Sequence, residues 1–544
     1  MTVQPFRRSW LGRCASVAGA VLPVLLSTGV PSASAQGLLA GQGETLPLTR
    51  DDVAYLALLN SRDLKVERFN TRILEREVPS ERATFHPIVS MENSESQSKN
   101  LAGSALSGAG TVENEATSWS SGVRARLISG AVASFDFVNS KLNTNSSFAT
   151  LNPQYQSSLA LTLTQPLLKG FGPTVNSWRI KIAENNVHIS RYQLQARVAG
   201  ILADAENTYW DLALAFKNSE IREQALELSR QLAKRTEELV AEGLIPETAL
   251  LQAKTSVLQR ETDLLSAKNT RVDMTRRLQD LLNFAPGDKS LLVPLDQPLT
   301  EPTRVDVEQA VKDALAQRPE LPQARLDVKN KDVALGYAKN QVLPQLNLFG
   351  NYGWSGLAGA PVAETQPTVT IPVSRRNTAT VTVDVFPSAG NAAVGGYGTA
   401  LDNLFSGDFP SWRVGMNLTF PLGNVAAKSQ LEKAELEMQR AEITVKNVER
   451  AIALEVERLG LQIESTFSVI GVARAFREQA QQRLDVTREK FGLGLVALSE
   501  VVEAQRDLLT ASQDEWKAIV DYNKVLVQFE RARGALLEKY RVDL

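Results

Sequence analysis

The segment 430–537 constrains the fold most, because it carries the pattern of two long helices interrupted only once, at 491–495. Before the interruption, apolar residues recur at alternating spacings of three and four, as in a coiled-coil seam. They are Leu431, Ala434, Met438, Ala441, Val445, Val448 and Ile452. A second apolar line lies on another face and consists of Leu436, Ile443, Leu454 and Leu461. Because a helix with two apolar lines packs against neighbours on more than one side, the segment predicts a helical hairpin that needs further partners.

The chain contains one structural unit written twice. Thr49 and Thr303 each precede a helical pattern, and each has an Asp three residues later, which is the arrangement of a helix-capping box. Each of these helices is expected to reach a proline that opens an extended segment, Pro87 or Pro344. Proline ends a helix because it lacks a backbone donor and biases the preceding residue to extended geometry. The two copies are therefore expected to share one order of elements.

Strand patterns follow in both copies. Residues 159–165 and 414–420 alternate apolar side chains with Thr, Asn, Gly or other small residues, and each run ends in a proline, Pro166 or Pro421. We interpret these prolines as strand-to-helix switches. A period of two with one apolar face fits half of a soluble sandwich, and it equally fits a membrane barrel with lipid outside and water inside.

Two long stretches rich in Ser, Asn and Gly, 92–118 and 356–410, are predicted to be mobile surface loops. An additional strand at 380–385 and an additional hairpin at 123–139, turning at 129–130, would bring the count to between four and six strands. A membrane barrel needs about eight or more strands, and lipid does not tolerate open strand edges. If the strands lie in a membrane, several copies must share one barrel.

The two helical hairpins have matching tips, at 242–247 and 491–498. Gly243 and Leu244 correspond to Gly494 and Leu495, 251 positions later. Glycine at a tip is explained by the turn alone, since it lets the backbone reverse. A leucine exposed at a turn is less expected. The outgoing helices span roughly 67 residues, or roughly 100 Å at 1.5 Å per residue, which suits a bridge between two layers.

Composition excludes several function classes. The 59 basic and 61 acidic residues nearly balance, so no nucleic-acid partner is indicated. His86, His188 and Cys14 are the only histidines and cysteine, which leaves a metal centre or a Cys/His catalytic site almost without ligands. We therefore expect no catalytic residues, no metal and no cofactor. Abundant Ala, Leu, Gln, Glu and Arg are typical of long helices.

Residues 1–35 have the pattern of a secretion signal. Three arginines precede an apolar run from Val17 to Leu26, and Ala33-Ser34-Ala35 offers a small-residue cleavage site. The alternative is a short membrane anchor, but the run is short and is followed by Ser and Pro. No later run approaches the roughly 18 apolar residues of a spanning helix.

Residues 161–172, residues 404–412 and the two Gly-Leu tips resemble the TolC family of outer-membrane efflux proteins. The resemblance implies an all-α dominated membrane α/β-barrel: a homotrimer with a shared twelve-stranded outer-membrane barrel and a periplasmic barrel of long helical hairpins. It also implies an exit duct for efflux or type I secretion, docked on a periplasmic adaptor tied to an inner-membrane transporter. The additional hairpin at 123–139 departs from the simplest four-strand pattern of the family.

On this basis the chain divides into two repeats, preceded by a signal peptide and joined by a proline-rich linker. The segments are the signal peptide 1–35, an N-terminal segment 36–48, a first repeat 49–283 (helix 49–84, strands and loops 85–166, hairpin 174–283), the linker 284–302, and a second repeat 303–540 (helix 303–342, strands and loops 344–421, hairpin 424–540).

The resemblance also assigns roles to the tips. Glu500 and Glu503 match positions where the family carries acids that form constricting rings at the periplasmic aperture, whereas the first repeat has Ala249 and Gln252 there. The helix dipole alone also favours acids in a first turn. Gly243, Leu244, Gly494 and Leu495 match the family's adaptor-docking tips.

Two other classes compete with a passive outer-membrane duct. A periplasmic coiled-coil adaptor that never spans a membrane would explain the hairpins, but such a protein normally has one hairpin beside a small β-rich domain. A secreted enzyme would need convergent polar groups, and the sequence offers no nucleophile–base pair, phosphate loop or metal cluster.

Overall fold

The structure is a computed structural model. It describes residues 45–101, 110–146, 149–285, 287–288, 290–362, 368–374, 377–382 and 393–542. The expected signal peptide 1–35 lies outside these residues. The chain forms two compact units. The helical unit comprises the described residues up to Arg68 together with Tyr192–Glu320 and those from Glu449 onward, and the sheet unit comprises Phe69–Arg191 and Leu321–Val448.

In each repeat, two helices are followed by strands and then by a long helical hairpin, but the strand segments of the two repeats differ. The helices are α1 (Arg50–Asn60), α2 (Arg62–Arg82), the 3₁₀ turn η1 (Ala83–Phe85), α3 (Pro173–Asn176), α4 (Trp178–Ala241), α5 (Glu247–Leu281), α6 (Val307–Gln317), α7 (Glu320–Gln341), α8 (Tyr397–Phe405), α9 (Val425–Gly492), α10 (Leu498–Arg533) and α11 (Leu536–Lys539). The strands are β1 (Thr45–Leu48), β2 (Ile88–Leu101), β3 (Thr111–Arg126), β4 (Val132–Thr144), β5 (Leu151–Pro166), β6 (Leu291–Pro294), β7 (Gln345–Pro361), β8 (Thr368–Ser374), β9 (Asn377–Thr382) and β10 (Pro410–Thr419).

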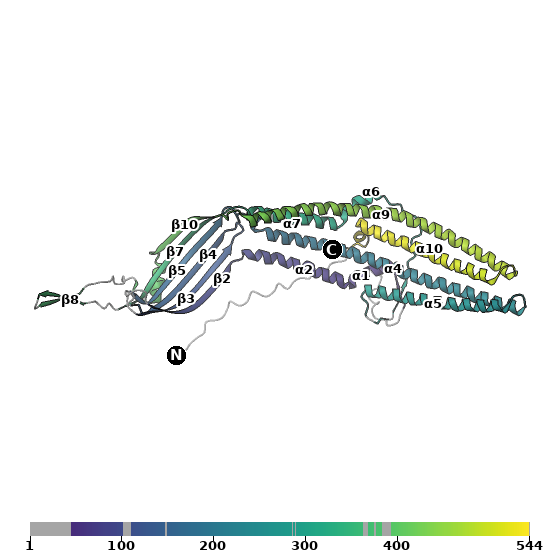
Figure 1. Cartoon of the computed structure of the whole chain (residues 1–544), viewed down its shortest axis with the longest axis horizontal. Coiled ribbons are helices and arrows are strands. Elements are labelled where there is room, and N and C mark those ends of the chain that lie inside the picture. Colours follow the sequence, from purple (N-terminus) through teal and green to yellow (C-terminus); the bar gives the residue numbers. More distant parts are fainter. Residues whose placement is uncertain are drawn as a thin grey trace, which may run out of the picture. The chain divides into compact units, whose positions relative to one another are not determined.

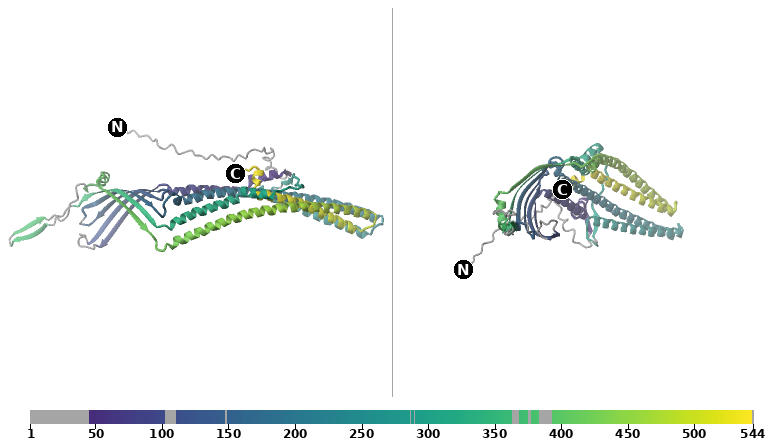
Figure 2. Two further views of the ribbon diagram at one scale, coloured as in Figure 1. Left: turned by 90° about the horizontal axis from the view of Figure 1, so that it is seen from above. Right: turned by 60° about the vertical axis from the view of Figure 1, so that its left-hand side comes forward.

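Six strands of the sheet unit form one antiparallel sheet in the order β10-β7-β5-β4-β3-β2. Figure 1 shows these strands side by side, and Figure 2 shows them as a single layer from two further directions. A short turn joins β3 to β4, whereas β8, β9 and α8 lie between β7 and β10 in the sequence, and β5 and β7 meet across the two repeats. The sheet therefore combines strands from both sequence repeats, four from the first repeat and two from the second.

Side-chain contacts place the helices of the sheet unit in a definite order, α2 beside α4, α4 beside α7, and α7 beside α9. The contacts are Arg82 with Glu184 at 2.6 Å, Asn185 Nδ2 donating to Asn330 Oδ1 at 2.8 Å, and Lys331 with Glu437 at 3.3 Å. Four helices thus lie side by side in the unit that carries the six-stranded sheet.

The helical unit has an apolar core between α1, α4, α5 and α10, where Leu202, Leu278 and Leu282 are fully buried. Tyr209 lies in this core and ties the inter-repeat linker to it. Its hydroxyl donates to Asp296 Oδ2 at 2.9 Å and accepts from the Asp296 amide at 2.9 Å. Burial raises the pKa of Tyr209, so the hydroxyl keeps its proton and remains a donor. The linker also supplies β6, which pairs in parallel with β1.

The first helix of each repeat is shorter than predicted. Instead of one helix over 49–84, α1 ends at Asn60 and α2 begins at Arg62, with Ser61 between them accepting the Leu64 amide. Instead of one helix over 303–342, α6 and α7 are separated by Arg318 and Pro319, because proline interrupts the backbone hydrogen bonding.

The two predicted capping boxes have different outcomes. At Thr49 both hydrogen bonds of the box are present. In the second repeat the cap is Asp306, whose carboxylate accepts the Gln309 amide, and Thr303 does not cap the helix. The Thr303 hydroxyl instead accepts a hydrogen bond from Tyr522 at 3.1 Å. The Thr303 hydroxyl, which the local sequence pattern predicts as a helix cap, is thus bound by a buried tyrosine of α10.

Neither predicted long loop is a loop throughout. Much of 92–118 is strand, because β2 reaches Leu101 and β3 begins at Thr111. Within 356–410, β7 continues to Pro361, and β8, β9 and α8 follow. Residues 102–109, 363–367, 375–376 and 383–392 of these stretches lie outside the described part. The sequence pattern does not predict the full length of β2, because its second half has no apolar alternation. Its backbone is nonetheless paired along its whole length with β3.

The additional hairpin at 123–139 is present as β3 and β4, which turn at Leu127–Ala131. Gly130 has φ +92°, and a Cβ there would lie 2.2 Å from the Gly170 carbonyl oxygen. Only glycine satisfies both conditions. The predicted strand at 380–385 appears at its first residues as the end of β9, which pairs with β8 apart from the main sheet.

Candidate channel wall and hairpin tips

One face of the six-stranded sheet is apolar over the half nearest the helices. Residues that pair directly across neighbouring strands share a face, and one such row is Val123, Phe135, Leu161, Tyr352 and Trp412. All five residues are exposed, from Val123 at 40% to Trp412 at 74%. A sheet that presents a continuous apolar row to its surroundings is not covered by its own chain.

The opposite face is polar. One residue further along each strand, the row reads Arg124, Ser134, Thr162, Asn351 and Arg413. Asn351 Nδ2 donates to Thr162 Oγ1 at 2.8 Å, and Ser134 Oγ donates to Asp136 Oδ2 at 2.8 Å. This alternation of an apolar and a polar face is that of a wall between lipid and water.

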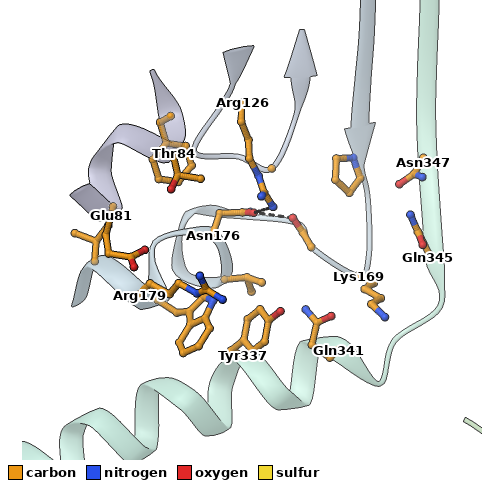
Figure 3. A pocket seen from close by; sticks show the side chains of 17 residues that line it. Glu81, Thr84, Arg126, Lys169, Asn176, Arg179, Tyr337, Gln341, Gln345 and Asn347 are labelled. Carbon is orange, nitrogen blue, oxygen red and sulfur yellow. Dashed lines mark hydrogen bonds between the residues drawn. The ribbon is translucent and has the colours of Figure 1, made fainter. Parts of the chain in front are cut away.

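At the end of the sheet where the helices begin lies a pocket of about 420 Å³ (Figure 3). Arg126, Lys169 and Arg179 line it together with one acid, Glu81. Arg126 Nη2 donates to Asn176 Oδ1 at 3.3 Å. The sequence did not predict the pocket, because its residues come from α2, β3, the 167–172 segment, α3, α4, α7 and β7, which only the fold brings together.

The predicted switch residue Pro166 is the last residue of β5, beside this pocket. Asn176 closes the turn that follows, since its side-chain amide donates to the carbonyls of Gly170 and Gly172 at 2.9 Å each. Pro421 lies between β10 and α9. There Asn424, at φ 45°, donates from its side chain to the Val342 carbonyl at 2.8 Å. Both strand-to-helix turns are thus held by an asparagine amide.

The two hairpin tips have the same backbone. Gly243 and Gly494 have φ +74° and +72°, in the left-handed region that favours glycine. The next amide in each tip, that of Leu244 or Leu495, donates back to a carbonyl five residues earlier. This is the usual glycine-based end of a helix, and it leaves the following leucine outside the helix. Leu244 and Leu495 are 67% and 70% exposed.

The tips are held against each other by a small apolar cluster of buried side chains from α4, α5, α9 and α10. Its members are Leu232, Leu239, Ala253, Leu484, Phe491, Leu498, Val501 and Ala504. Behind it, Gln505 of α10 bridges to α4 through Ser229 Oγ and the Leu228 carbonyl, each at 3.4 Å. The exposed Leu244 and Leu495 therefore lie next to this well-packed apolar cluster.

The acids and their counterparts occupy matching positions on the first two turns of the return helices. Glu500 and Glu503 are exposed at the start of α10, while Ala249 and Gln252 occupy the start of α5. Gln252 also lines a groove of about 820 Å³ between α5 and α10, with Leu251, Val502 and Arg506. Sequence reasoning missed this groove, because it depends on how two helices of different repeats approach each other.

Apolar lines remain uncovered on the helices. On α9 the first predicted line is buried where it meets its neighbours, at Ala434, Ala441 and Ile452, but the second line is exposed. α5 carries another exposed line, Leu251, Leu258 and Leu265, at intervals of seven. A spacing of seven is typical of a coiled-coil seam, so the sequence contains a signal for this exposed line on α5.

No helix in the described part of the chain is long and apolar enough to cross a membrane. Among the same residues, no cluster of His, Cys, Asp and Glu is placed to hold a metal ion.

A two-faced sheet and long paired hairpins define the class: an outer-membrane channel protein with a periplasmic helical extension. The chain belongs to the outer membrane efflux protein family, whose sequence model matches residues 134–283 and 310–535. It is thus a TolC-like efflux channel of the cell outer membrane, and the reading as a non-spanning adaptor is not supported. No curated protein sequence matches the chain.

Solved structures agree on the fold. The CmeC outer membrane channel of Campylobacter jejuni superposes with a TM-score of 0.59 at 17% identity, covering 89% of this chain and 85% of that one. The outer membrane protein VceC of Vibrio cholerae gives 0.60 at 16% identity, with 89% and 96% covered. The open state of the MtrE outer membrane channel of Neisseria gonorrhoeae gives 0.56 at 16%, with 89% and 88% covered.

Proposed function

We propose that three copies of this chain form the exit duct of a multi-component export system. In this duct, substrates pass from an inner-membrane transporter through a periplasmic adaptor and across the outer membrane. The two-faced sheet with two open edges carries the proposal, because lipid does not tolerate unpaired strand edges and one copy cannot close a barrel. The exposed apolar lines on α5 and α9 support it independently, since they need neighbouring helices.

The tips are the proposed docking site for the periplasmic adaptor. Gly243 and Gly494 set the turn, and Leu244 and Leu495 supply exposed apolar anchors of the kind that partner contacts use. The groove between α5 and α10 lies beside these anchors and offers a concave surface for a helix of the adaptor.

Glu500 and Glu503 are proposed to line the periplasmic aperture. In a threefold assembly each acid would recur three times around the axis, and a ring of carboxylates attracts cations and repels anions. Pro166 and Pro421 are proposed as the switches from the membrane barrel to the helical tube.

In this proposal the duct is passive. It catalyses no reaction and uses no cofactor, metal or nucleic acid, and the chain is exported by a signal peptide cleaved after Ala35. Both drug-type efflux and type I secretion would use such a duct.

Purified protein in planar lipid bilayers tests the proposal. We expect stepwise conductance with a preference for cations, from protein that leaves the outer membrane only in detergent. Protein that is released without detergent, or that produces no conductance steps, would contradict it.

A further inference from the structure

The number of strands in the sheet does not match the barrel that the family resemblance implies. A twelve-stranded barrel shared by three copies takes four strands from each. This chain has six in one continuous sheet, ending at β2 on one side and at β10 on the other. Either two strands stay out of the barrel or the barrel is larger.

Near the helices, the two outer strands carry exposed apolar residues on the same face as the central strands. β2 carries Val89 and Met91 on the apolar face, and Met91 is 82% exposed. β10 carries Val414 and Met416 on that face, both also exposed. The apolar face therefore reaches both edges near the helices, whereas beyond Met91 the same face of β2 carries Asn93, Glu95, Gln97 and Lys99.

The two edge strands also run in directions that allow them to pair. β2 follows the helix α2 and β10 leads into the helix α9, and five antiparallel pairs separate them, so the two strands run in opposite directions. β2 of one copy beside β10 of the next would therefore form a sixth antiparallel pair. Such a contact joins different surfaces of identical copies and closes into a ring by rotation.

The width of the sheet fits the helices of the same unit. Four helices side by side, roughly 8–10 Å apart, occupy about 32–40 Å of a perimeter. Six strands about 4.8 Å apart, tilted by about 40°, occupy about 38 Å, whereas four would occupy about 25 Å. Six strands continue the helical layer without a change of circumference, and four would require it to narrow.

We propose that all six strands of every copy enter the shared barrel, so that the three-copy channel closes through β2–β10 pairs into a ring of eighteen strands. This inference rests on the proposed trimer for its copy number and on the sheet for its six strands per copy. Barrels of 16–18 strands enclose an aqueous channel when their interior is polar.

Disulfide trapping tests the edge contact. Ser411 on β10 and the serines 90, 94, 96 and 98 on β2 all lie on the polar face, and Ser411→Cys is combined with each β2 substitution in turn. At least one pair should crosslink neighbouring copies into covalent dimers and trimers. The control pairs Ser411→Cys with Ser120→Cys on β3, which is interior to the sheet and should give no intermolecular link. Crosslinking in the control alone, or in no β2 pair, would overturn the inference.

Electron microscopy of the detergent-solubilised channel separates the inference from the function on which it rests. Eighteen strands in a three-copy particle are expected. Twelve strands in a three-copy particle would overturn the eighteen-stranded ring and leave the proposed duct intact. A particle with a different number of copies would overturn the proposed trimer itself, and the eighteen-stranded ring with it.

Discussion

The tips of the two hairpins have the same backbone geometry but differ in the charged side chains that follow the turn. Each reverses at a left-handed glycine followed by an exposed leucine, but the return helices differ at two matched positions. The second has the exposed acids Glu500 and Glu503 there. The first has Ala249 and Gln252 there. The shared part follows from what any helix end and any docking anchor require. In the proposed function, both tips dock the adaptor, whereas only the second tip lines the aperture with acids.

Replacing both exposed leucines should have the largest effect. Leu244→Asp with Leu495→Asp removes two apolar anchors, each worth about 1.5–3 kcal/mol when buried, so adaptor binding should weaken at least a hundredfold. Accumulation of a fluorescent efflux dye in cells that express the complete export system measures the loss of export. The matched control, Leu244→Met with Leu495→Met, keeps the anchors apolar and should export normally. Normal export by the aspartate variant would reject the docking role.

Neutralising the acids of the second tip should alter selectivity without abolishing transport. Glu500→Gln with Glu503→Gln removes two negative charges per copy from the aperture, and the cation-over-anion permeability ratio should fall several-fold in planar bilayers. Glu247→Gln on the first tip removes an exposed acid that lies outside the matched pair. An equal fall in that control would erase the distinction between the two tips.

Transferring the acids to the first tip should have the opposite and smaller effect. Ala249→Glu with Gln252→Glu adds carboxylates at the corresponding turn of α5, and the permeability ratio should rise about twofold. The rise is smaller because acids already present hold the cation preference. If the ratio does not change, the two hairpins do not meet the aperture in equivalent ways.

The smallest difference concerns the ion pairs that brace each hairpin. Glu515 is buried between Arg474 and Arg477 of α9, at 3.3 and 2.5 Å. The Asp263 side chain is 25% exposed and lies 3.9 Å from Arg222 of α4 and 3.4 Å from Arg260 of its own helix. Glu515→Ala leaves two arginines without their partner and should cost about 2 kcal/mol, against under about 1 kcal/mol for Asp263→Ala. Thermal unfolding in detergent compares them, and equal shifts in Tm would show that burial does not distinguish the pairs.

Features with a local cause could be predicted from the sequence. The seam of α9, the glycine tips and the capping box at Thr49 each depend on residues a few positions apart, and the structure contains all three. The exposed second line of α9 was also foreseen as a line in need of partners. Local spacing encodes these features because helices repeat over three to four residues.

Features decided by distant residues could not be predicted. The sequence of β2 lacks alternation beyond Met91, so its full extent depends on pairing with β3. Thr303 does not cap its helix, and its hydroxyl instead accepts a hydrogen bond from Tyr522, more than two hundred residues away. The groove between α5 and α10 and the pocket near Pro166 likewise need the fold to bring their walls together.

The mass of the particle in a native state most directly decides whether one chain is incomplete alone. Protein extracted from outer membranes in detergent, examined by native mass spectrometry, should contain three copies, with no folded species left in detergent-free buffer. A folded single copy that stays in solution without detergent would contradict the shared barrel and the proposals that depend on it.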